Sequence, residues 1–236
     1  MKSKYPFLLV FLFLFLSAPA LHSQSESGDQ VVGGMSIKRL DRYENFLHSE
    51  INTDKLSGAV YMVYRKGELV KQSALGYASE VEKTPMKLDN LFYIQSMTKP
   101  IITTALMMLY EEGHFLLEDP VSKYLPDFKD LKVIRDVNTG KDGPTDPIKR
   151  EVTIAHLLSH TAGFSHGLGA SQLDKDVRQE QYYQKYPDIA SRVKNLTSLP
   201  LVGQPGEQWY YSAAPDVLSL LIEKFSGMPT NQFLEE

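Results

Sequence analysis

The sequence has no cysteine among its 236 residues. This absence excludes disulfide bonds, thiolate nucleophiles, cysteine-ligated zinc or iron–sulfur sites and a lipid anchor on cysteine. A net positive charge is also absent, because 25 lysine and arginine residues stand against 29 aspartate and glutamate residues, a formal net charge of −4. A basic surface for nucleic acid is therefore not expected. The hydrophobic and charged fractions, 42% and 23%, are those of an ordinary globular protein.

Long hydrophobic runs are missing except near the N-terminus, where residues 7–16 are apolar without interruption. A membrane-spanning helix needs about 20 apolar residues, so this run is too short to be an anchor. Lys2 and Lys4 precede it and small residues follow it, which is the layout of a secretory signal peptide over residues 1–23. Cleavage after Ala20 or after Ser23 fits the pattern. We therefore expect a protein of the periplasm or the extracellular space, with no stable membrane anchor and a mature net charge of −6, since the segment removes two lysines and no acid.

The rest of the chain predicts a mixed α/β protein with an N-terminal hairpin. Residues 24–35 are polar and glycine-rich, typical of a linker, and residues 36–236 form the expected domain. Apolar spacing, capping residues and β-forming runs predict helices over 36–49, from about 96 to 112, over 153–160, over 216–226 and from 230 onward, strands over 58–65 and 68–76, and irregular chain over 136–147 and 164–208.

Ser96 and Lys99 form an S-x-x-K pattern at a predicted helix start. Residues three apart on a helix lie on one face, about 5–6 Å apart. A serine hydroxyl is a weak nucleophile until a base accepts its proton, and the neutral amine of a desolvated lysine can be that base. The helix N-terminus adds positive potential suited to an oxyanion. Taken alone, the pattern also fits a capping serine beside a solvated lysine.

Four segments together resemble the serine β-lactamase and penicillin-binding-protein superfamily, closest to its class C-like branch of DD-peptidases, esterases and related hydrolases. In chain order they are FYIQSMTKPIITTALMMLYEE (92–112), GHFLLEDPVSKYLPDF (113–128), VTIAHLLSHTAGF (152–164) and PGEQWYYSAAPDVLSLLIEKFSG (205–227). The resemblance implies an α+β fold, with an antiparallel sheet flanked by helices and an all-helical lobe. It also implies a serine hydrolase that works through an acyl-enzyme and needs no metal or organic cofactor. Its substrates would be esters, D-amino-acid peptides of the peptidoglycan type or β-lactams.

Carried over residue by residue, the resemblance makes Ser96 the acylated nucleophile and Lys99 its partner. Tyr211 matches the tyrosine of the family's Y-x-N motif and would relay the proton to the leaving group. The family's asparagine, two residues further on, is replaced here by Ala213. This departure resembles esterase-type members more than efficient β-lactamases.

A second departure concerns the family's third motif, a Lys/His-x-Gly on a later strand whose backbone N–H completes the oxyanion hole. No such strand follows the helix predicted over 216–226, so we expect only the N-terminal part of the fold. Losing one oxyanion donor typically costs about 10²–10³ in rate. A non-catalytic remnant or ligand-binding pseudo-hydrolase is therefore the alternative to the enzyme.

Three other patterns compete with these residues and are interpreted as structural. Ser165 lies in a G-x-S-x-G match, but a helical segment precedes it, whereas an α/β-hydrolase elbow needs a strand there. His156 and His160 lack the glutamate of a zinc-protease motif. The tyrosines at 182, 183 and 186 fit a packing patch better than the border of a substrate cleft.

Overall fold

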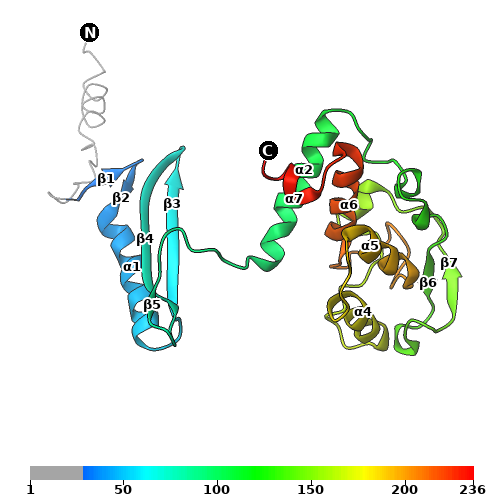
Figure 1. Cartoon of the computed structure of the whole chain (residues 1–236), viewed down its shortest axis with the longest axis horizontal. Helices are drawn as coiled ribbons and strands as arrows, with labels where there is room; N and C mark the ends of the chain where they lie inside the picture. Colours follow the sequence, from blue (N-terminus) through cyan, green and yellow to red (C-terminus); the bar gives the residue numbers. More distant parts are fainter. Residues whose placement is uncertain (1–28) are drawn as a thin grey trace, which may run out of the picture. The chain divides into compact units, whose positions relative to one another are not determined.

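The computed structural model describes residues 29–236, and the chain divides into two units, Met1–Phe92 and Tyr93–Glu236, which are described separately (Figure 1). The predicted signal peptide and residues 24–28 of the predicted linker lie outside the described residues. Within residues 29–236, every helix is too short or too polar to cross a membrane.

The first unit is a helix packed against an antiparallel hairpin (Figure 1). Strands β3 (Gly58–Arg65) and β4 (Glu68–Ser79) pair along their length, and β5 (Thr84–Pro85) adds to the other edge of β4. Lys66 and Gly67 join the strands with positive φ at both positions, as a tight two-residue hairpin turn requires. The predicted hairpin is therefore confirmed.

Helix α1 (Ile37–Asn52) covers one face of this hairpin. Its apolar side meets the sheet in a small core centred on Leu47, Tyr61 and Leu75. Ser36 caps the helix, since its Oγ accepts a hydrogen bond from the Arg39 N–H at 3.1 Å, as the sequence predicts.

Part of the segment interpreted as a linker has regular structure. Strands β1 (Val31–Val32) and β2 (Met35–Ser36) form a short antiparallel pair. The two glycines between them, at positions 33 and 34, both have positive φ. Glycine content suggested a flexible link, but here the glycines form the turn between residues that favour strands.

The second unit is built around two helices that pack along each other, α2 (Thr98–Glu111) and α6 (Ala214–Ser226) (Figure 1). Their facing side chains, including Leu106, Leu109 and Leu221, are almost completely buried. Around them lie η2 (Val121–Lys123), η3 (Pro126–Phe128), β6 (Lys132–Ile134), η4 (Val137–Thr139), β7 (Thr145–Pro147), α3 (Ile154–Leu158), α4 (Gln172–Tyr182), α5 (Ile189–Ser198) and α7 (Thr230–Phe233). Strands β6 and β7 pair antiparallel. Together the two units confirm the predicted α+β class.

The prediction of irregular chain over residues 164–208 is wrong, because α4 and α5 lie there. Helix α4 has a narrow buried stripe of Leu173, Val177 and a glutamine, Gln181, so its apolar signal is weak. Its start is marked instead by a capping box between Ser171 and Asp174. Helix α5 carries its apolar residues at helical spacing but is only ten residues long.

Candidate active site

The structure brings Ser96, Lys99 and Tyr211 together within the second unit. The Tyr211 hydroxyl donates a 2.7 Å hydrogen bond to Ser96 Oγ, and Lys99 Nζ donates to the same oxygen at 3.2 Å. Lys99 Nζ also lies 4.7 Å from the centroid of the Tyr211 ring. These two donors orient the serine oxygen, and the phenol, once deprotonated, lies within reach of the serine proton.

Local structure at the start of α2 sets the spacing of the first two residues. Ser96 lies in a 3₁₀ turn, η1 (Gln95–Met97), that leads directly into α2, and Lys99 lies in the first turn of that helix. Gln95 has a φ of 51°, in the left-handed region that non-glycine residues rarely adopt. Pro100 follows in the same first turn, where a missing N–H leaves no helical hydrogen bond unmade. The chain therefore turns sharply just before the serine.

Tyr211 is placed by the loop that precedes α6. Its neighbour Tyr210 donates its backbone N–H to the His160 carbonyl at 2.8 Å. The other neighbour, Ser212, is buried, and its hydroxyl accepts from the Ala214 N–H at 3.3 Å and lies 3.2 Å from His160 Nδ1. Because α2 and α6 pack along each other, their N-terminal ends bring the serine and the phenol together. Both helix N-termini favour negative charge at this point.

The electrostatics of the site lower the pKa of Tyr211. Burial alone raises the pKa of a phenol, but hydrogen bonds with Lys99 and Ser96, together with the charge of the lysine, outweigh it. Two histidines beside the ring, His160 and His166, have pKa values lowered by burial and by Lys99. Both imidazoles are therefore neutral at neutral pH, because the ordinary value is already about 6.5.

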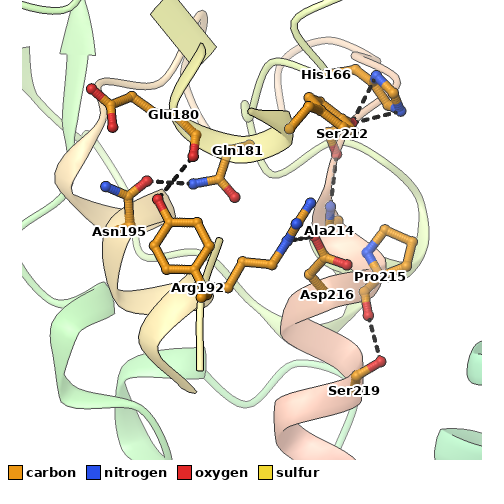
Figure 2. A network of polar contacts seen from close by, with 12 residues as sticks. His166, Glu180, Gln181, Arg192, Asn195, Ser212, Ala214, Pro215, Asp216 and Ser219 are labelled. Carbon is orange, nitrogen blue, oxygen red and sulfur yellow. Dashed lines mark hydrogen bonds and ion pairs between the residues drawn. The ribbon is translucent and has the colours of Figure 1, made fainter. Parts of the chain in front are cut away.

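Ser96 and Lys99 line a cavity of about 190 Å³ in the second unit. Its lining residues are Tyr93, Gln95, Ser96, Lys99, His166, Tyr182, Arg192, Ser212, Ala213, Pro215 and Asp216. On one wall Arg192 Nε donates to Asp216 Oδ2 at 2.8 Å, and Figure 2 shows these two side chains pointing toward each other. Tyr211 and His166 also border a second cavity of about 380 Å³. The site thus has a polar cavity at Ser96 and a second, adjoining cavity bordered by Tyr211.

Two residues of the competing patterns, Ser165 and His156, have structural roles. Ser165 is only 5% exposed, and its hydroxyl donates to Asp174 Oδ1 at 2.6 Å while accepting from the Gly167 N–H at 2.8 Å. His156 closes a capping box with Thr153 at the start of α3. Within residues 29–236 no three histidine, aspartate or glutamate side chains are grouped as a metal site would require.

Sequence reasoning missed His166 and underestimated Tyr182. The His166 ring stacks on Tyr211, with centroids 4.8 Å apart and an interplanar angle of 13°, and it also contacts the Tyr182 ring, with centroids 5.4 Å apart. The sequence favours a packing patch for the tyrosine-rich stretch, yet Tyr182 lines the serine cavity. Its hydroxyl has a pKa raised to about 12, chiefly by burial and then by the charge of Asp216. No spacing rule connects a loop histidine to a tyrosine 45 residues away, so only the folded structure shows this contact.

Comparison with known proteins supports the same segments. A family model described as "Beta-lactamase" matches residues 44–236. The chain is 35% identical over 178 residues to Esterase EstB of Burkholderia gladioli, covering 74% of this chain and 42% of that protein. It is 31% identical over 170 residues to Penicillin-binding protein 4* of Bacillus subtilis, covering 72% and 33%.

Among solved structures, the fold matches EstCE1, described as a hydrolase with promiscuous acyltransferase activity. The TM-score is 0.69 at 28% identity, covering 83% of this chain and 49% of that one. The chain spans about half the length of the relatives it matches, or less.

Proposed function

Because the chain belongs to the β-lactamase family, we propose that it is a serine hydrolase that forms an acyl-enzyme on Ser96 and acts on esters. The observation that carries the proposal is the pair of hydrogen bonds on Ser96 Oγ, one from the Tyr211 phenol and one from the Lys99 amine. A lone surface serine has neither a proton acceptor nor a fixed orientation. Here hydrogen bonds of 2.7 and 3.2 Å fix the orientation of the hydroxyl, and the nearer partner is a phenol that can accept the serine proton once it is deprotonated.

The geometry supports a two-step reaction. Once Tyr211 is deprotonated, Ser96 Oγ bonds to the ester carbonyl carbon while its proton passes to the Tyr211 phenolate, which thereby becomes the neutral phenol. The carbonyl electron pair moves onto oxygen, close to the N-terminal ends of α2 and α6. Collapse breaks the bond to the alcohol oxygen, which takes the proton from Tyr211. Water then attacks the acyl group by the same route, and Ser96 recovers its proton.

Two features favour esters over β-lactams and peptides. Ala213 occupies the position of the family's asparagine, so no amide is present there to hold a lactam or peptide carbonyl. The adjoining cavity of about 380 Å³ is bordered by Leu168, Val202 and Trp209, an apolar wall suited to the hydrocarbon part of an ester. The relatives named above as an esterase and as a hydrolase agree with this choice.

Covalent labelling of the full chain tests the proposal. An alkyl phosphonate ester probe should transfer its phosphonyl group to Ser96 with release of its alcohol, which adds the mass of that group to the peptide, and Ser96→Ala should abolish the adduct. Ser165→Ala is the matched control and should keep the adduct, because that hydroxyl is buried and paired with Asp174. Tyr211→Phe should slow labelling by at least about 10²-fold, the usual contribution of a general base. Folded protein that takes up no probe would instead favour a ligand-binding protein without turnover.

Export is part of the proposal and rests on residues 1–23. The basic, apolar and small-residue regions of this segment support removal by a signal peptidase. The N-terminal sequence of the protein recovered from the periplasm or medium of a bacterial host should begin after Ala20 or Ser23. Recovery of the uncleaved chain from the cytoplasm would contradict export without affecting the assignment of Ser96.

A further inference from the structure

His166 holds a position that the proposed chemistry does not use. Its ring lies nearly parallel to that of Tyr211, at 4.8 Å and 13°, so the two flat faces are in contact. Its own nitrogens both lie 3.1 Å from the Tyr182 hydroxyl. His166 therefore connects the phenol at Ser96 to a second phenol on α4.

The backbone around His166 is held by hydrogen bonds within its loop and between the loop and α4. Arg178 Nε donates to the Gly167 carbonyl at 2.7 Å, and the Gly167 N–H donates to Ser165 Oγ at 2.8 Å. Ser165 is itself bonded to Asp174 of the same helix. A ring that projects from a segment held this way has little freedom to leave its partner.

Tyr211 needs a neighbour that holds its ring in place. Its hydroxyl must stay within hydrogen-bond distance of Ser96 Oγ, yet the residue lies on a loop and not inside a helix. His160 contacts the same ring at 5.0 Å but is tilted by 43°, so it does not cover a face. The stacked imidazole of His166 covers one.

We infer that His166 is a positioning residue for Tyr211, and that Tyr182 in turn orients His166. This inference rests on the proposed function, because it concerns the phenol that takes the Ser96 proton. The groups that act electrostatically on His166 are Lys99, Asp216 and His160. The neutral imidazole leaves one unprotonated nitrogen to accept from the Tyr182 hydroxyl, whose high pKa keeps it protonated.

A double-mutant cycle on the full chain tests the inference, with the rate of phosphonate labelling at Ser96 as the readout. His166→Ala should slow labelling about tenfold in the unchanged background, since misplacing a reacting group by about 1 Å can cost up to about 10²-fold. In the Tyr211→Phe background the same substitution should change the rate by less than about twofold, because the group that His166 positions has lost its function.

Conservative variants separate positioning from folding. His166→Phe keeps a flat ring and should recover most of the rate, whereas Tyr182→Phe removes only the hydroxyl and should lower it by a smaller factor than His166→Ala. His114→Ala is the matched control, because His114 follows α2 at the end remote from Ser96. This variant should label at Ser96 at the same rate as the unchanged chain. Urea midpoints of all variants report whether each one is folded.

The outcomes are distinguishable. An equal loss in both backgrounds would overturn the inference and leave the proposed function intact, because the histidine would then act on folding or on the whole cavity. A folded His166→Phe variant that labels no faster than His166→Ala would overturn the inference too. Failure of the unchanged chain to label at Ser96 would overturn the proposed function itself, and the inference with it.

Discussion

The ionisation of Tyr211 determines at which pH the proposed reaction runs. A phenol accepts the Ser96 proton only when it is deprotonated, and free tyrosine has a pKa of about 10. Lys99 and Ser96 lower the pKa of Tyr211 despite its partial burial. The rate of labelling should therefore rise with pH through a midpoint below 10.

Removal of the lysine charge should move this midpoint upward. In Lys99→Met the phenol loses a hydrogen bond and a nearby cation, so its pKa rises and the ascending limb of the rate profile shifts to higher pH. Lys99→Arg keeps the charge and should shift the limb less. The measurement is the pseudo-first-order labelling rate between pH 6 and 10 in wild type and both variants, with an unmoved midpoint in Lys99→Met as the contradicting result.

At the scale of elements, helix α4 buries a polar side chain that its sequence pattern does not predict. Gln181 is completely buried, its Nε2 donates to Asn195 Oδ1 of α5 at 2.6 Å, and its Oε1 has no hydrogen-bond partner among the described residues (Figure 2). A buried acceptor without a partner costs about 1–3 kcal/mol. A leucine at this position would continue the stripe of Leu173 and Val177 without that cost.

Gln181→Leu should therefore raise the free energy of unfolding by about 1 kcal/mol, because Asn195 is partly exposed and can bond to water in place of the glutamine. Gln179→Leu, on the exposed side of the same helix, is the control and should change it by less than about 0.5 kcal/mol. Urea unfolding followed by circular dichroism gives both values. A clear loss of stability in Gln181→Leu would show that its bond to Asn195 outweighs the unpaired oxygen.

Local patterns account for much of what the sequence predicted. The cap at Ser36, the Lys66–Gly67 turn and the apolar faces of α2 and α6 are each determined by residues close in the chain. The same holds for the i, i+3 relation of Ser96 and Lys99. What failed depends on distant contacts: α4 buries a polar side chain, and His166 meets Tyr211 only after two loops are folded together.

At the scale of the whole molecule, each unit has its own hydrophobic core. Leu47 belongs to the core between α1 and the hairpin, whereas Leu221 of α6 lies in a core of the second unit. The second unit is also the one that contains the proposed site residues, Ser96, Lys99 and Tyr211. Replacing a buried leucine by alanine costs about 2–5 kcal/mol in the unit that contains it. The two substitutions should therefore have different consequences for the proposed site.

Leu221→Ala should lower the urea concentration at which Ser96 stops reacting with the probe, because it weakens the helix pair whose ends bring the serine and the phenol together. Leu47→Ala should lower the unfolding midpoint reported by Tyr61, whose ring lies in the first core, and leave the labelling curve of Ser96 within error of wild type. The two readouts are tyrosine absorbance, with Tyr61→Phe identifying its contribution, and probe incorporation across a urea series. Equal shifts of the Ser96 curve in both variants would show that the two units unfold as one, and that the site depends on the first unit for its stability.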